Sequence, residues 1–208
     1  WAKWAEKEVT NGNMTFWAIL QKVGGIDQDT SPNILIINTF KDIDKGADWS
    51  SIATMFPDVK MENIETWGIS TNVHQIFLTD LPNHVRAENT SNDDYNYARM
   101  IYHDVKNIGQ HLDFESEKWK PMVEQAMKDG KTSMKGWGNQ TIISPVTTSF
   151  TYSSFSYDIF SSMQDALLPA FSEDNLVADG FWDGFQDNYN KRNSNLYRVV
   201  ASATAPAE

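Results

Sequence analysis

The sequence carries an internal similarity that limits the folds open to it. Met14 and Trp17 recur 120 positions later as Met134 and Trp137. Each pair follows an amphipathic segment that ends in Asn-Gly or Asp-Gly, as at Gly12, and glycine there favours the left-handed turn that ends a helix. Similarity at a fixed offset is typical of a duplicated unit. We therefore expect both halves of the chain to repeat one order of helices and strands.

Hydrophobic patterning predicts the elements of the second half. Strands are predicted over 95–105, 133–143, 150–159 and 196–203, and helices over 113–128, 161–168 and 172–189. The order is β-α-β-β-α-β, with an added helix before the last strand. Asp113 is the expected N-cap of the first helix, and Pro121 is expected to distort that helix, because proline has no amide hydrogen to donate.

The first half shows the same order without its first strand. A helix up to Gly12 is followed by predicted strands over 13–23 and 33–40, a helix over 42–55 and a strand over 73–81. Because the chain opens inside a helix without a signal pattern, we expect that an N-terminal piece carrying the missing strand has been lost.

Polar composition predicts the domain boundaries. The segment 83–94 is rich in turn-forming residues and is the expected linker. The first repeat is then 1–82 and the second 95–204, followed by a tail at 205–208.

The repeated segments resemble the dimeric α/β-barrel superfamily, the ferredoxin-like modules that include antibiotic-biosynthesis-monooxygenase-like proteins. The resemblance is carried by Glu117–Glu124, Gly130, Met134–Trp137 and Ser156–Phe160, and in the first half by Asn11–Trp17 and Ile37–Phe40. It implies an α+β fold in which two tandem repeats pack sheet to sheet as a barrel within one chain. Relatives include cofactor-free oxygenases, haem-handling enzymes and isomerases, so the fold alone selects no reaction.

Composition excludes several classes of protein. The 208 residues include 17 basic and 28 acidic side chains, a net charge of −11, which disfavours nucleic acid as a partner. The absence of cysteine excludes disulfides, thiolate catalysis and iron–sulfur clusters. The apolar runs are too short to cross a bilayer, which predicts an acidic, soluble protein without a transmembrane segment. A chain without cysteine fits export and the cytoplasm alike, so the compartment stays open.

Strand alternation suggests a ligand-binding face. In the strand 13–23, Trp17 shares the more polar face, whereas Met14 lies on the other. Trp137 and Asn139 share the corresponding face in the second half. Tryptophan beside amide groups could stack and orient a flat organic ligand in a cavity. The alternative is that Trp17 and Trp137 are repeated core residues.

Arg99 and His103 share one face of the strand 95–105. Together they could bind a carboxylate or move a proton, since histidine titrates near neutral pH. Tyr157, on a neighbouring strand, is expected to join them. The alternative is a solvent-facing strand end on which His103 pairs with a carboxylate.

The sequence predicts no metal site and no cofactor. The four histidines, at positions 74, 84, 103 and 111, form no closely spaced pair. Ligand-type residues alternate at His111, Asp113 and Glu115, but a helix cap explains the two carboxylates. A haem would need only one axial histidine, and no motif selects one.

Three functions remain open. The first is a small-molecule-binding protein whose site includes Trp17, Trp137, Asn139 and Tyr157. By resemblance, the second is a cofactor-independent monooxygenase or isomerase, with His103 transferring a proton and Arg99 stabilising an anion. The third is a structural or assembly component that contacts a protein partner, or forms a homo-oligomer, through a surface of tryptophans at positions 1, 4, 49, 67 and 182.

Overall fold

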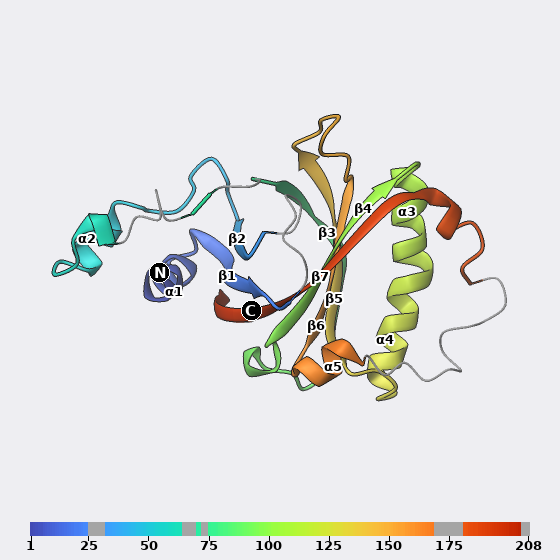
Figure 1. The fold of residues 1–208 in the computed structure, drawn as a ribbon. Coiled ribbons are helices and arrows are strands. Elements are labelled where there is room, and N and C mark those ends of the chain that lie inside the picture. Colours follow the sequence, from blue (N-terminus) through green and yellow to red (C-terminus); the bar gives the residue numbers. More distant parts are fainter. Residues whose placement is uncertain (25–31, 64–69, 72–74, 169–180, 205–208) are drawn as a thin grey trace. The chain divides into compact units, whose positions relative to one another are not determined.

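The computed structural model describes residues 1–24, 32–63, 70–71, 75–168 and 181–204. Its contacts divide the chain into two compact units. Unit 1 comprises Trp1–Lys22, Ile26–His74 and Val199–Glu208, and unit 2 comprises Val23–Gly25 and Gln75–Arg198. The elements are drawn in Figure 1. The long strand β7 (Tyr189–Thr204) contributes to both units.

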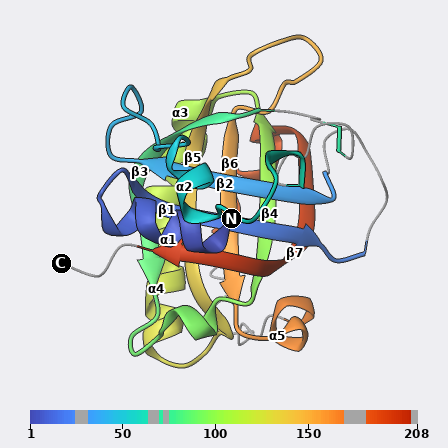
Figure 2. The ribbon, with the colours of Figure 1, turned by 90° about the vertical axis from the view of Figure 1, so that its left-hand side faces the viewer.

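Unit 1 contains one layer of helix against strands. Its elements are α1 (Ala2–Thr10), β1 (Met14–Lys22), β2 (Ile34–Phe40), α2 (Ser51–Met55), a 3₁₀ turn (Met61–Asn63) and the end of β7. β1 pairs antiparallel with β2, and α1 lies against β1 (Figure 2). Gly12 ends α1 with a φ of 75°, as the sequence predicts.

Trp17 lies in the hydrophobic core of unit 1. Trp4 and Val9 of α1 pack with both Met14 and Trp17, and Trp17 is 2% exposed. The prediction that Met14 and Trp17 lie on opposite faces is therefore wrong. The register of β1 shifts between Met14 and Phe16, and one extra residue moves every later side chain to the other face.

A buried carboxylate ties α1 to the loop before α2. Glu8 is fully buried, and its Oε2 accepts hydrogen bonds of 2.8 Å from Asn13 Nδ2 and from the Asp48 amide. We expect Glu8→Ala to lower the free energy of unfolding by about 2–3 kcal/mol, because both donors lose their hydrogen-bond acceptor. Urea denaturation checks this, with the exposed Glu6→Ala in the same helix as the matched control. Equal stability of the two variants would contradict the assignment.

Unit 2 is an antiparallel sheet with a long helix on one face (Figure 1). The strands are β3 (Phe77–Arg86), β4 (Tyr97–Val105), β5 (Met134–Ser144), β6 (Ser154–Phe160) and the start of β7. Their order is β3-β5-β6-β4-β7. The helix comprises α3 (Ile108–Phe114), a π-helical turn (Glu115–Trp119) and α4 (Lys120–Lys128), and α5 (Met163–Leu167) follows β6. Short 3₁₀ turns lie at Asn92–Asp94 and Gln186–Asn188.

The core of unit 2 lies between α4 and the sheet. Val123 packs with Met134, Trp137 and Phe160, all nearly inaccessible to solvent. The element order from β4 to β7 is the β-α-β-β-α-β order predicted for this part of the chain. The duplication and the domain boundaries at 82 and 95 stay predictions.

The long helix begins earlier than the sequence predicts. Its N-cap is Asn107, whose Oδ1 accepts from the Gln110 amide, and not Asp113. His111 is therefore inside the helix, not at its entrance. The π-helical turn ends two residues before Pro121, which supplies no amide hydrogen to the preceding turn, so the predicted distortion takes this form.

Other boundaries also differ from the prediction. β3 extends to Arg86, so 83–86 of the expected linker are strand, and β6 begins at Ser154 instead of residue 150. Of the helix predicted over 42–55 only Ser51–Met55 forms, since Gly46 turns the chain at a φ of 59°. For the helix predicted over 172–189, 181–185 form turns, whereas 172–180 and the tail 205–208 lie outside the described residues.

Candidate functional site

One face of the unit 2 sheet carries a set of polar side chains. In the pairing of β4 with β6, Arg99, Ile101 and His103 lie opposite Asp158, Ser156 and Ser154. On β5, Trp137 pairs with Asp158 and Asn139 with Ser156, and on β7, Arg192 pairs with His103. Directly paired residues point to the same face of a sheet. The structure thus brings together four of the residues proposed from the sequence: Arg99, His103, Trp137 and Asn139.

Two other proposed residues lie elsewhere. Tyr157 pairs with Gly138 and Met100, so it lies on the opposite face of the sheet, and its hydroxyl lies over the Cα of Gly138. A Cβ at Gly138 would come within 2.4 Å of that hydroxyl, which accounts for glycine here. The prediction that Tyr157 joins Arg99 and His103 is wrong, because successive residues of a strand alternate between faces. Trp17 lies in the core of unit 1.

The polar face opens into a cavity of about 140 Å³ within unit 2. Its aromatic lining comes from the sheet, from the long helix and from the turns at 181–185: Trp119, Trp137, Phe160, Trp182 and Phe185. Its charged lining consists of Arg99, Glu115, Asp158 and Arg192. A cavity of about 150 Å³ holds one benzene ring. The space in unit 2 therefore suits a single-ring ligand.

The two carboxyl groups of the cavity hold their protons unusually tightly. Burial raises the pKa of Asp158 to about 6, although the Arg99 guanidinium, 3.7 Å away, lowers it. Burial and then Asp158 raise the pKa of Glu115 to about 8, although Arg192 lowers it. At pH 7 the cavity therefore holds two guanidinium groups against one ionised carboxylate. This positive balance favours an anionic ligand, with Arg192 partly shielded by water because its side chain is exposed.

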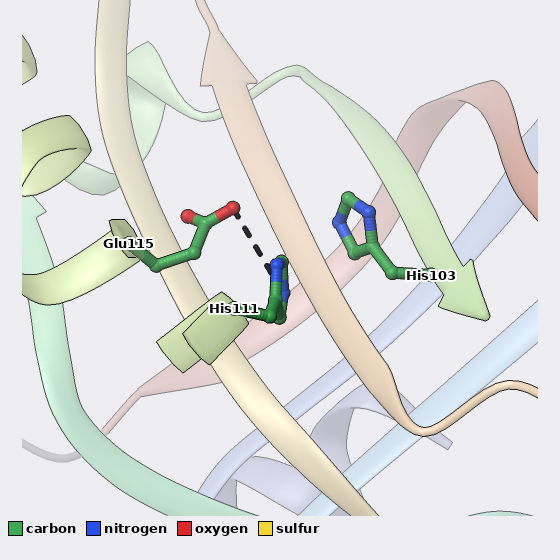
Figure 3. Close-up of side chains that lie close together, drawn as sticks. All are labelled: His103, His111 and Glu115. Atoms are coloured by element: carbon green, nitrogen blue, oxygen red, sulfur yellow. Dashed lines mark ion pairs between the residues drawn. The ribbon is translucent and has the colours of Figure 1, made fainter. Parts of the chain in front are cut away.

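Behind Ser156 lies a pair of buried histidines, His103 and His111, whose ring centroids are 4.9 Å apart (Figure 3). His103 Nε2 bonds Ser156 Oγ at 2.8 Å. His111 bonds Ser154 through Nε2 at 3.1 Å and the Tyr189 hydroxyl through Nδ1 at 3.0 Å. Burial lowers the pKa of His103 to about 2 and that of His111 to about 4, and Arg192 adds to both effects. Both imidazoles are therefore neutral at pH 7.

The helix explains how Glu115 reaches this pair. His111 and Glu115 are four residues apart, so they lie on the same side of the helix, and His111 Nε2 is 4.0 Å from Glu115 Oε1. The π-helical turn begins at Glu115. Such turns insert one residue and often occur at functional sites.

Sequence reasoning did not propose Asp158, Glu115 or Arg192 as site residues. Asp158 did have a signal, because it is the only charged residue in the strand Ser-Phe-Ser-Tyr-Asp-Ile-Phe. A charge in a strand with large apolar neighbours is costly unless it is paired. Arg192 had none, since it lies in a polar run that was not predicted to be strand.

The expected surface of tryptophans is only partly present. Trp1 and Trp49 are 43% and 54% exposed, but Trp4 is fully buried between them and the core, and Trp182 lines the cavity of unit 2. Trp67 lies outside the described residues. Within the described part of the chain, no helix is long and apolar enough to cross a membrane.

Comparison with solved structures shows the fold. The match to a proposed monooxygenase from Lactobacillus acidophilus NCFM covers 100% of this chain and 88% of that protein, with 11% identity and a TM-score of 0.56. The match to an anthrone oxidase-like protein covers 97% of this chain and 84% of that protein, with 10% identity and a TM-score of 0.55. The match to a proposed monooxygenase from Fusobacterium nucleatum covers 98% of this chain and 87% of that protein, with 10% identity and a TM-score of 0.52.

These likenesses extend over nearly the whole chain and agree with the α+β, α/β-barrel-like fold expected from the sequence. No protein-family model and no curated protein sequence matches the chain. At these sequence identities the comparison shows the fold only, and the activity has to be argued from the residues of the site.

Proposed function

We propose that this chain is a small-molecule-binding protein whose cavity in unit 2 takes a single-ring planar organic anion. One observation carries the proposal: three tryptophans and two arginines meet in a cavity sized for one aromatic ring. Tryptophan faces stack on flat rings, and guanidinium groups pair with carboxylates. The solved structures of similar fold include proposed monooxygenases and an anthrone oxidase-like protein, which fits a small organic ligand.

The roles of the residues follow from their positions. Trp137 forms the sheet side of the cavity, Trp119 lines it from the long helix and Trp182 from the turns at 181–185, so a ring would lie among indoles. Arg192, exposed beside the cavity, would pair with the anionic group of the ligand. Asn139, 1% exposed on the same face, has no hydrogen-bond partner for its amide oxygen or nitrogen among the described residues. It would supply polar contacts next to Ser156.

Calorimetric titration with benzoate tests the proposal. Benzoate is one ring with one negative charge, and we expect a Kd of about 1 mM, since a ligand of this size gains roughly 4 kcal/mol. Benzamide has the same shape without the charge and should bind at least about 5-fold more weakly. Arg192→Met should remove that difference, whereas Arg198→Met, an exposed arginine of the same strand, should leave it. Equal affinities for benzoate and benzamide in the wild type would contradict the proposal.

Trp137→Phe separates a binding role from a packing role. Phenylalanine keeps an apolar ring in the core, so the protein should fold, but the lost indole surface should weaken benzoate binding about 3- to 10-fold. The matched substitution Trp17→Phe, in the core of unit 1, should leave the affinity unchanged. If both variants bind benzoate like the wild type, Trp137 is a core residue only.

A second candidate is an enzyme that moves a proton without a cofactor. The observation that favours it is Asp158, whose carboxyl lines the cavity beside Arg99 with a pKa of about 6. As its carboxylate it could accept a proton from the carbon next to a carbonyl, leaving an enolate whose charge the arginines stabilise. His103 suits this role less well, because its pKa of about 2 makes its imidazole a weak base.

Deuterium exchange tests the enzyme candidate. Phenylpyruvate, a single-ring anion with an acidic carbon–hydrogen bond, should exchange that hydrogen in D₂O faster with protein than without it. Asp158→Asn should lower the protein-dependent rate at least about 100-fold, as expected for loss of a general base. An unchanged rate in Asp158→Asn would remove Asp158 from the mechanism, while benzoate binding would still test the cavity.

A further inference from the structure

Three ligand-type side chains meet below the cavity of unit 2. His103 comes from β4, His111 from α3 and Glu115 from the π-helical turn, and one ligand atom of each lies within 4.8 Å of the others (Figure 3). All three residues are at least nine-tenths buried. The sequence argument against a metal site compared only residues close together in the chain. Here the seven residues between His103 and His111 comprise the end of β4, a short link and the start of α3, and they bring strand and helix together.

The ring of His111 is already oriented for metal binding. A neutral imidazole offers the lone pair of one ring nitrogen to a metal ion, and its other ring nitrogen can make a hydrogen bond. The Tyr189 hydroxyl bonds Nδ1 of His111, which holds the ring with its Nε2 toward Glu115. Metal-ligating histidines are oriented in this way by a partner on the other ring nitrogen.

The hydrogen bonds of the cluster are incomplete. Among the described residues, Glu115 Oε2 and His103 Nδ1 are buried without a hydrogen-bond partner. A buried polar atom without a partner is unfavourable, because it has lost its hydrogen bonds to water. A metal ion bound by Glu115 would give its buried carboxyl group a partner, so it would offset part of this cost.

Geometry and charge set the cost of filling the site. Ligand atoms about 2.0–2.2 Å from an ion lie roughly 3.0–3.5 Å from one another, so the three side chains must close by about 1 Å. His103 and His111 would give up their Nε2 hydrogen bonds to Ser156 and Ser154, and both serine hydroxyls can rotate. Arg99 and Arg192 oppose a further cation, but Arg99 is paired with Asp158 and Arg192 is exposed, whereas the carboxyl groups of Glu115 and Asp158 are buried and favour one.

We propose that His103, His111 and Glu115 bind a divalent first-row transition-metal ion such as Zn²⁺. Two imidazoles and one carboxylate are a ligand set that suits these ions and leaves further positions open. The open positions would lie toward Ser156, which lines the cavity. This site goes beyond the proposed binding of an organic anion, because it rests on different residues apart from Glu115.

Equilibrium dialysis of the metal-free full chain against Zn²⁺ tests the site. We expect one ion per chain with a Kd of about 10 µM or lower, weakened about 100-fold or more in His103→Asn and in Glu115→Gln. His84→Asn, at an exposed histidine of the same unit, is the matched control and should bind like the wild type. Binding that survives both site variants, or no binding to the wild type at 100 µM Zn²⁺, would overturn the proposal.

A measurement on the wild type keeps the test independent of how the variants fold. Co²⁺ in place of Zn²⁺ should give a visible absorption band of a nitrogen- and oxygen-ligated ion, and should broaden the ring NMR signals of His103 and His111. Broadening confined to His84 would place the ion on the surface and contradict the site. Benzoate titration in the presence of a chelator then tests the cavity separately, so the two proposals can fail independently.

Discussion

Glu115→Gln is expected to make folding much more sensitive to acid. The Glu115 carboxyl has a pKa of about 8 in the folded chain and about 4.5 when unfolded, so the folded chain binds a proton first as the pH falls. Between pH 7.5 and pH 5 this stabilises the fold by about 3 kcal/mol, and Asp158, with a pKa of about 6, adds about 1 kcal/mol. The glutamine variant loses the larger of these two contributions.

The histidines act in the opposite direction. Unfolded histidines bind protons below about pH 6.5, whereas His103 and His111 stay neutral in the folded chain, with pKa values of about 2 and 4. Between pH 7.5 and pH 5 each therefore removes about 2 kcal/mol of stability. In the wild type the two carboxyls and the two imidazoles nearly cancel, and the stability should change little over this interval.

Urea denaturation at pH 7.5 and pH 5, with a chelator present, measures the difference. Acidification should lower the stability of Glu115→Gln by about 3 kcal/mol more than that of the wild type. Asp158→Asn should show a smaller change of the same sign, and His103→Asn should gain about 2 kcal/mol on acidification relative to the wild type. A Glu115→Gln variant with the pH dependence of the wild type would show that this carboxyl ionises normally.

Trp4→Ala is expected to destabilise unit 1 by about 4 kcal/mol. The Trp4 side chain is fully buried, stacks on Trp49 at 4.4 Å and donates from Nε1 to the Asp48 carbonyl. Removing a buried tryptophan leaves a large cavity, which costs about 3–5 kcal/mol. The expectation that Trp4 belongs to an outward surface predicts a much smaller loss, so the variant distinguishes a core residue from a surface residue.

Trp49→Ala is the matched control for Trp4→Ala. Trp49 contacts the same ring but is 54% exposed, so its removal should cost about 1 kcal/mol or less. Circular dichroism during urea denaturation measures both variants without relying on tryptophan fluorescence. Similar losses in the two variants would contradict the packing of α1. Whether Trp1 and Trp49 contact a partner or a second copy stays a prediction.

The strands and the helix ends could be predicted because their signals are local. Alternation and glycine positions fix β1, β2 and β5 to within one or two residues, and Gly12 ends α1 as expected. The faces of β1 could not be predicted, since the shift after Met14 depends on pairing with β2 and leaves no mark in the sequence.

The site could be predicted only where its residues share a strand. Arg99 and His103 are on one face because they are four residues apart on β4. His111 and Glu115 reach the same place only because the helix begins at Ile108 and includes a π-helical turn, and Arg192 only because β7 pairs with β4. The approach of these side chains depends on tertiary contacts that cannot be predicted from a single sequence.

The central claim is that the cavity of unit 2 binds a small organic anion, and NMR of the tryptophan indole N–H groups tests it most directly. Titration with benzoate should shift the signals of Trp119, Trp137 and Trp182, which line the cavity, and leave that of Trp4 in unit 1 unchanged. Benzamide should shift the same three signals only at higher concentration. No shift at about ten times the expected Kd, or shifts confined to the exposed Trp1 and Trp49, would contradict the account.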